Sequence, residues 1–178
     1  MKIVAIIPAR AGSKRLKKKN KLELNKKPLI EWTINFAKKL KELTCIIVST
    51  DDKDIQKIAL KNKVICSSLR PKYLSSDKAQ TAEVCIYEIN KLKKNLKFDA
   101  ILLLQPTSPF RSLKNIKKAI KIFKQKKFNS LISVSKFSIN KKTIIEKKGK
   151  IATYLLNAKK NLFKINGNFY LITNKELK

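Results

Sequence analysis

Histidine is absent from the 178 residues. The chain therefore lacks the side chain that most often serves as a general base or a metal ligand. Only three cysteines occur, widely spaced and without a C-x-x-C pair, so the sequence indicates neither a disulfide framework nor a zinc site. We expect Cys45, Cys66 and Cys85 to be free thiols, as is usual in a reducing compartment.

Long hydrophobic stretches are absent as well. No apolar run approaches the roughly 18 residues that a membrane helix needs, and the residues after Met1 enter a strand-like run without the features of a signal peptide. The length suits one domain with a sizeable core. We expect a cytoplasmic protein that forms a single domain over residues 1–178 and has no membrane partner.

Acidic residues are scarce: 12 stand against 43 basic ones, which gives a formal net charge of +31. Such a charge is found in nucleic-acid-binding proteins, so a basic nucleic-acid-binding module is one alternative. Only four of the basic residues are arginine, however, whereas nucleic-acid surfaces favour arginine together with stacking aromatic residues. In residues 113–126 the lysines avoid the helically spaced Ile116, Ile120 and Phe123, which predicts a solvated helix face. We expect no specific nucleic-acid partner.

Glycine is rare too, and Gly12 is one of only three. It lies directly after the apolar run at residues 3–7, in the segment AIIPARAGSKR, with Arg10, Ser13 and Lys14 around it. Glycine allows a close approach of the backbone to a ligand, and cations and backbone N–H groups at the end of a strand suit a polyphosphate. The loop matches neither the GxxxxGK[ST] nor the GxGxxG motif. The alternative is a basic surface loop.

Short apolar runs alternate with amphipathic segments along the chain. The runs, which are typical of strands buried on both faces, are at residues 3–7, 45–48, 101–104 and 131–134. Helices are predicted at residues 28–43, 52–61, 81–96 and 113–126, with a weak strand at 64–66. Near the C-terminus we predict a hairpin at residues 143–155, a turn at Asn166-Gly167 and a last strand at 169–172. The alternation predicts an α/β fold, a three-layer sandwich around a mostly parallel sheet.

Further polar segments follow the predicted strands. They are KKKN at residues 17–20, STDD at 49–52, LRPKYLSSDKAQT at 69–81 and LLQPTSPFR at 103–111. Since the carboxyl ends of parallel strands meet at one edge of a sheet, these segments are expected to converge on one rim with the first loop.

Together with NGNFY at residues 166–170, these motifs resemble those of the acylneuraminate cytidylyltransferases, also called CMP-N-acetylneuraminic acid synthetases. The resemblance runs from residue 3 to about residue 172. It implies a Rossmann-like nucleotidyltransferase fold with a β-hairpin excursion, shortened here, at about residues 140–165, which in the family supplies the contact of a homodimer. It also implies the reaction of CTP with a nine-carbon 2-keto sugar acid of the sialic acid type. The products would be a CMP-sugar for glycan biosynthesis and pyrophosphate, with Mg²⁺ as cofactor.

The resemblance assigns roles to individual residues. The implied nucleotide-binding residues are Arg10, Gly12, Ser13, Lys14, Lys19, Asn20, Arg70 and Thr81. Arg10 and Lys14 would be catalytic because cations neutralise the charge of the leaving pyrophosphate. Gln105 would be the third catalytic residue and would bind the sugar acid beside the α-phosphate. Simpler interpretations stay open: Arg70 as a structural ion-pair partner, Gln105 as a cap of the next helix, and Asp52 as the start of a helix.

The metal ligands are not identified. The resemblance implies a pair of Mg²⁺-binding aspartates after NGxxY, and the sequence reaches Lys178 without that segment. Asp51, Asp52 and Asp77 are carboxylates of the expected rim, but none matches the pair. We therefore expect CTP binding with slow or undetectable turnover by these 178 residues. The alternative is a catalytically weak or inactive CTP-binding remnant.

Overall fold

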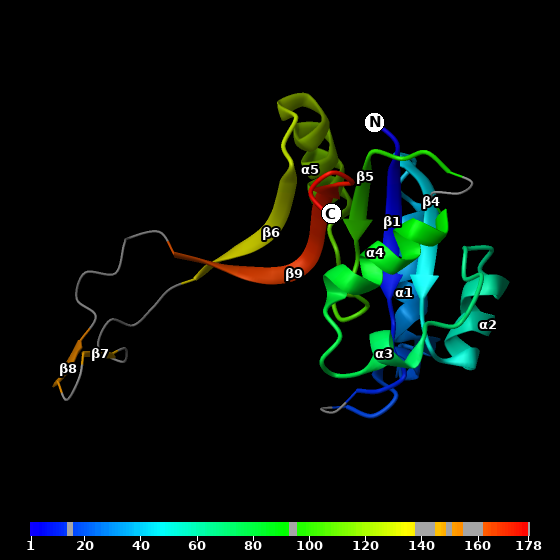
Figure 1. Ribbon diagram of the computed structural model, residues 1–178, viewed down its shortest axis with the longest axis horizontal. Coiled ribbons are helices and arrows are strands. Elements are labelled where there is room, and N and C mark those ends of the chain that lie inside the picture. The colour runs from blue at the N-terminus through cyan, green and yellow to red at the C-terminus, as the bar shows by residue number, and fades with distance from the viewer. Residues whose placement is uncertain (14–15, 93–95, 138–144, 149–150, 155–161, 178) are drawn as a thin grey trace. The chain divides into compact units, whose positions relative to one another are not determined.

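A computed structural model of the protein describes residues 1–13, 16–92, 96–137, 145–148, 151–154 and 162–177 (Figure 1). The chain divides into two compact units, one of residues 1–132 and 167–178 and the other of residues 133–166. The single domain expected over the whole chain stays a prediction.

The central sheet contains five strands in the order β4-β1-β5-β9-β6. Their bounds are β1 Ile3–Pro8, β4 Leu43–Ser49, β5 Ala100–Leu103, β6 Ser130–Phe137 and β9 Leu162–Thr173. β1 runs parallel to both β4 and β5, whereas β9 runs antiparallel to β5. Pro8 pairs with Ser49, and Ile6 pairs with Leu103, so the carboxyl ends of the three parallel strands share one edge of the sheet. The mostly parallel α/β sheet is confirmed.

Side chains of β1 alternate between two apolar clusters, one on each face of the sheet. Ile3, Ala5 and Ile7 pack with residues of α1, α2 and α5, whereas Val4 and Ile6 pack with residues of α4. The helices are α1 Leu29–Lys38, α2 Lys53–Lys61, α4 Thr81–Leu92 and α5 Leu113–Lys126. Helices therefore cover both faces, which confirms the three-layer sandwich (Figure 1).

Helix α5 has the bounds that the sequence predicts. Its buried residues are Ile116, Ala119, Ile120 and Phe123, and the lysines between them are exposed. This arrangement confirms the solvated lysine face. Within the described residues, no helix is both long enough and apolar enough to cross a membrane.

Small elements complete the first unit. The 3₁₀ helix η1 covers Lys19–Lys21, the strands β2 and β3 cover Glu23–Leu24 and Lys27–Pro28, and α3 covers Lys72–Ser75. β2 and β3 form a two-residue hairpin in which Asn25 and Lys26 have φ values of 50° and 57°. Positive φ at both central residues is what a type I′ turn requires. This hairpin was not predicted from the sequence.

Three predicted elements are wrong in detail. α1 ends at Lys38 rather than at residue 43, because Leu43 already pairs with Ile3 as the first residue of β4. The weak strand at residues 64–66 is only an isolated bridge between Ile65 and Ile47. The turn predicted at Asn166-Gly167 lies inside the continuous strand β9, which accommodates the positive φ of Gly167, 70°, without reversing the chain.

The second unit contains the predicted hairpin. β7, Ile145–Lys148, pairs antiparallel with β8, Ile151–Tyr154. The remaining residues predicted for this hairpin, 143–144, 149–150 and 155, lie outside the described residues. In the same unit Asn166 joins β9 to β6: its Nδ2 donates to Ser135 Oγ at 2.8 Å, and its Oδ1 accepts from Ser133 Oγ at 2.7 Å. The dimer contact expected of this region stays a prediction.

All three cysteines are free thiols, as predicted. Cys66 and Cys85 are buried, and Cys45 is half-buried. Burial raises the pKa of the Cys85 thiol to about 12, with the nearby Glu88 carboxylate as a second cause. Because the thiolate is the reactive form, Cys85 is inert at neutral pH.

Candidate functional site

A cavity of about 360 Å³ lies at the edge of the sheet where β1 and β5 end. Eight of the nine residues predicted for the site line it: Arg10, Gly12, Ser13, Lys19, Asn20, Arg70, Thr81 and Gln105. The ninth, Lys14, lies outside the described residues. Segments far apart in the sequence thus converge on one rim, as the order of the motifs predicts.

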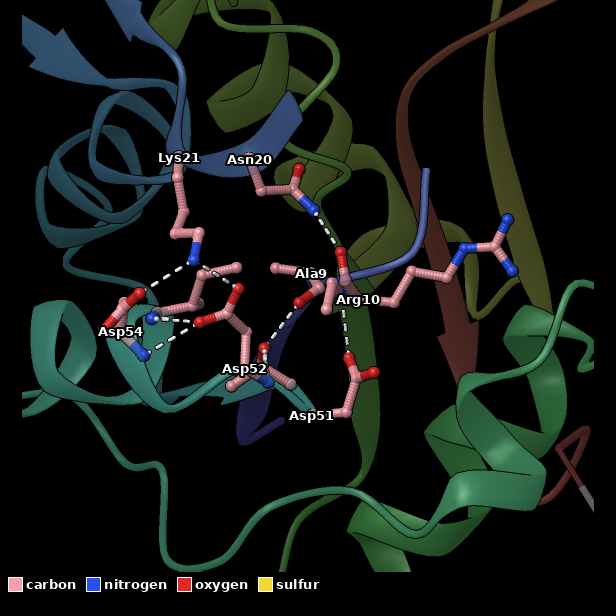
Figure 2. Close-up of polar contacts among 10 residues, drawn as sticks. Ala9, Arg10, Asn20, Lys21, Asp51, Asp52 and Asp54 are labelled. Atoms are coloured by element: carbon pink, nitrogen blue, oxygen red, sulfur yellow. Dashed lines mark hydrogen bonds and ion pairs between the residues drawn. The ribbon is translucent and has the colours of Figure 1, made fainter. Parts of the chain in front are cut away.

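Hydrogen bonds from two other segments hold the backbone of the loop after β1 (Figure 2). The Nδ2 group of the buried Asn20 donates to the carbonyl of Arg10 at 3.0 Å. Asp51 Oδ1 accepts from the backbone N–H of Ala11 at 2.8 Å, and Thr50 Oγ1 donates to the carbonyl of Ala9 at 2.6 Å. These contacts fix the backbone before Gly12, at which an added Cβ would meet no atom within 4 Å. The space at Gly12 is open toward a ligand.

Asp52 begins a helix, as its simpler interpretation predicts. Its Oδ1 atom accepts hydrogen bonds from the backbone N–H groups of Asp54 at 2.8 Å and Ile55 at 3.4 Å, which makes it the N-cap of α2. Lys21 Nζ lies 2.9 Å from Asp52 Oδ2 and 2.8 Å from Asp54 Oδ2 (Figure 2). Hydrogen bonds to Asp54 and Asp52 raise the pKa of Lys21. Asp52 therefore serves the local structure.

Replacement of Asp52 with alanine is expected to lower the free energy of unfolding by about 1 kcal/mol, because loss of an N-cap side chain leaves backbone donors unsatisfied. Urea denaturation measures the change. Asp54→Ala is the matched control: it removes an exposed carboxylate two residues away that also pairs with Lys21 but is not the N-cap. Equal losses in the two variants would contradict the capping role.

Arg10 is paired with a segment that lies 67 residues away. Its Nη1 donates to the carbonyl of Ser76 and its Nη2 to Asp77 Oδ1, both at 2.7 Å. In Figure 2 the Arg10 side chain points away from Lys21, Asp52 and Asp54. Ser76 and Asp77, the two partners of Arg10, both line the cavity. A phosphate bound by Arg10 would therefore either share the guanidinium with Asp77 or displace the Asp77 carboxylate from it.

Arg70 carries a buried charge at the cavity. Only 6% of the residue is exposed, and its Nε and Nη2 groups have no hydrogen-bond partner in the part of the chain that the structure describes. Burial lowers the pKa of Arg70, while the charges of Asp51 and Glu88 act in the opposite direction. No carboxylate among the described residues lies within ion-pair distance of it, which argues against the structural ion-pair interpretation. Buried donors are nearly always satisfied, so this cavity suits a ligand that supplies acceptor oxygens.

Gln105 and Thr81 complete the cavity wall. Gln105 follows β5, and its Oε1 atom would lie 3.3 Å from a Cβ placed on Gly167. The interpretation of Gln105 as a helix cap is wrong, because Ser112 caps α5 by accepting from the N–H of Asn115 at 3.3 Å. Thr81 is the first residue of α4. The roles of all these residues toward a ligand stay predictions.

The described residues alone do not form a metal site. No group of three or more His, Cys, Asp or Glu side chains among them could hold an ion. Asp51 and Asp52 bond to the backbone of residues 11, 54 and 55, and Asp77 bonds to Arg10. Mg²⁺ therefore stays a prediction without assigned protein ligands.

A sequence model described as cytidylyltransferase matches residues 4–178. The chain belongs to the cytidylyltransferase family. Over 189 residues it is 36% identical to the CMP-N,N'-diacetyllegionaminic acid synthase of Legionella pneumophila, a match that covers 99% of the chain and 80% of that protein. Over 136 residues it is 38% identical to the N-acylneuraminate cytidylyltransferase of Escherichia coli, covering 76% of the chain and 32% of that protein. It is also similar to a Campylobacter jejuni pseudaminic acid cytidylyltransferase, at 33% identity over 77% of the chain and 60% of that protein.

Solved structures show the same fold. CMP:2-keto-3-deoxy-manno-octonic acid synthetase in complex with CTP superimposes with a TM-score of 0.77 at 19% identity, covering 99% of this chain and 76% of that one. A 4-diphosphocytidyl-2C-methyl-D-erythritol synthase from Anaerococcus prevotii gives a TM-score of 0.65 at 21% identity, covering 98% and 72%. These comparisons confirm the resemblance seen in the sequence, the nucleotidyltransferase fold and an enzyme of the cytidylyltransferase type.

Proposed function

We propose that this cytidylyltransferase binds CTP in the rim cavity and transfers the cytidylyl group to a sugar acid of the sialic acid type. The observation that carries the proposal is the buried guanidinium of Arg70, two nitrogens of which have no partner among the described residues, in a cavity that seven other predicted site residues also line. Family membership supports the choice of CTP.

The substrate class follows from the relatives. Those with 33–38% identity are named for legionaminic, acylneuraminic and pseudaminic acids. A substrate that carries a carboxylate also suits a chain of formal charge +31. We therefore propose a nine-carbon 2-keto sugar acid, and with it the cytoplasmic location and the homodimer that the resemblance implies.

In the proposed reaction the anomeric hydroxyl of the sugar acid attacks the α-phosphorus of CTP. A bond forms between that oxygen and phosphorus, the bond to the oxygen that bridges to the β-phosphate breaks, pyrophosphate leaves, and the proton of the hydroxyl passes to water. Arg10 and Lys19 would neutralise the departing charge, and the Gln105 amide would donate to an oxygen of the α-phosphate without adding negative charge. No protein nucleophile is required. Mg²⁺ belongs to the proposal as an ion held mainly by substrate oxygens and water.

CTP is expected to raise the melting temperature of the protein more than ATP or GTP at the same concentration. A ligand at 100 times its dissociation constant stabilises the native state by about 2.7 kcal/mol, which for a chain of this size corresponds to roughly 5–10 °C. Differential scanning fluorimetry measures the shift. Equal shifts with all three nucleotides would contradict the cytidylyl assignment.

Pyrophosphate release with CTP and a panel of sugar acids then tests the transfer itself. Release with one of the acids, and none with CTP alone, is the expected result. A melting shift with CTP but no release with any acid would instead support the CTP-binding remnant. Binding that weakens steeply with salt for any nucleic acid offered would support the basic nucleic-acid-binding module.

A further inference from the structure

Arg111 carries a buried charge that does not face the rim cavity. Only 9% of the residue is exposed, and it lines a separate hollow with Trp32 and Phe110. Within the described residues no carboxylate pairs with it. Burial lowers the pKa of Arg111 to about 10, so the guanidinium is still protonated at neutral pH.

Three different segments accept hydrogen bonds from this one guanidinium. Nη2 donates to the backbone carbonyl of Gln105, and Nε donates to the carbonyl of Asn168 at 2.7 Å. Nη1 donates to Thr33 Oγ1 of α1 at 3.1 Å, and the group lies 5.9 Å from the centre of the Phe36 ring. Charge-assisted hydrogen bonds are about twice as strong as neutral ones. Arg111 therefore ties the segment after β5 to β9 and to α1.

The same segment meets β9 at a second point. Ser108 Oγ donates to the carbonyl of Gly167 at 3.4 Å, next to the carbonyl of Asn168 that Arg111 holds. Gly167 has a φ of 70°, and a Cβ on it would come within 3.3 Å of Gln105 Oε1. Arg111 thus holds the backbone carbonyl of Gln105, and the lack of a side chain on Gly167 leaves room for Gln105 Oε1.

We propose that Arg111 is a positioning residue for Gln105. It holds the segment after β5 and does not line the cavity itself, and with Gly167 it sets the position of the Gln105 carboxamide at the cavity rim. The inference rests on the proposed function for what Gln105 then does to the α-phosphate. The position of the Gln105 carboxamide is a property of the chain itself and does not depend on a bound ligand.

The catalytic test uses Arg111→Met, Arg111→Lys, Gln105→Ala and the double variant. Arg111→Met is expected to lower kcat at least tenfold with the CTP dissociation constant within twofold of the original, and Arg111→Lys is expected to recover part of the loss. If Arg111 acts through Gln105, kcat falls no further in the double variant than in Gln105→Ala alone, because the two effects are not additive. A double variant in which kcat falls by the product of the two single-variant losses would overturn the proposal.

A second measurement does not require turnover. The side-chain amide of Gln105 gives an NMR signal that Gln105→Ala identifies by its disappearance. Its order parameter is expected to fall in Arg111→Met and in Gly167→Ala, the latter because a Cβ at residue 167 would come within 3.3 Å of Gln105 Oε1 and because alanine is strained at a φ of 70°. An unchanged order parameter in both variants would overturn the proposal, whatever the enzyme assays give.

Stability is controlled with Ile120→Val, a substitution of a buried core residue on α5. It is expected to lower the melting temperature and leave the Gln105 signal unchanged. Should Arg111→Met fail to fold, Arg111→Lys and Gly167→Ala carry both tests. Absence of turnover in the unmodified chain with rigid Gln105 would count against the proposed function and not against the positioning.

Discussion

Arg70→Met is expected to weaken CTP binding by about 10- to 100-fold while leaving the unliganded protein as stable as before, or more stable. A hydrogen bond to a charged group contributes roughly 1.5–3 kcal/mol, and about 1.4 kcal/mol corresponds to a factor of ten in affinity. The guanidinium is buried, and two of its nitrogens have no partner in the described part of the chain, which is costly. Methionine fills a similar space without a polar group.

Isothermal titration calorimetry with CTP and urea denaturation measure the two effects. Lys72→Met, at an exposed position of α3 two residues away, is the matched control, because it removes a positive charge without affecting a buried group. Unchanged CTP affinity in Arg70→Met would remove Arg70 from the site. A large loss of stability would show instead that its charge supports the fold.

Phe123→Ala is expected to lower the free energy of unfolding by about 3–5 kcal/mol, since removal of a buried aromatic side chain leaves a cavity. Phe123 is fully buried on the inner face of α5, in the cluster that covers one side of β1. Typical domains have a total stability of only about 5–15 kcal/mol. The variant should therefore be partly unfolded at 37 °C, which circular dichroism and urea denaturation would reveal.

Lys121→Ala on the outer face of the same helix is the control. A surface substitution of this kind usually changes stability by less than about 0.5 kcal/mol. A loss of several kcal/mol in Lys121→Ala would mean that the lysine face packs against another part of the protein. A loss below 1 kcal/mol in Phe123→Ala would mean that α5 contributes little to the core.

Much of the fold was predictable because its signals are local. The apolar run of β1 is buried on both faces, and α5 shows an apolar stripe between lysines, so each pattern identifies its element. The end of α1 was not predictable in the same way. Leu40 and Leu43 continue the helical spacing, but Leu43 is the first residue of β4, and periodicity cannot separate two adjoining buried elements.

The candidate site was predictable as a set of residues but not as a set of contacts. Motif order placed Arg10, Arg70 and Gln105 at one rim, because the ends of parallel strands converge. The pairing of Arg10 with Asp77 and the hydrogen bonds from Arg111 to Thr33 and Asn168 join segments more than 50 residues apart. No local pattern specifies such partners. The Asn166-Gly167 pair correctly indicates a positive φ, which Gly167 has, but only the fold shows that the pair lies within a strand.

The position of β1 between β4 and β5 has a consequence for the order of folding during synthesis. β1 comes first in the chain, but it pairs with β4 on one side and with β5 on the other, and Leu103 pairs with Ile6. While the ribosome makes the intervening segment, an apolar strand with an unpaired edge is exposed. Such edges are prone to aggregation and are slow to pair because their contacts are distant in sequence. The nascent chain is therefore most in need of a chaperone between the emergence of β1 and that of β5.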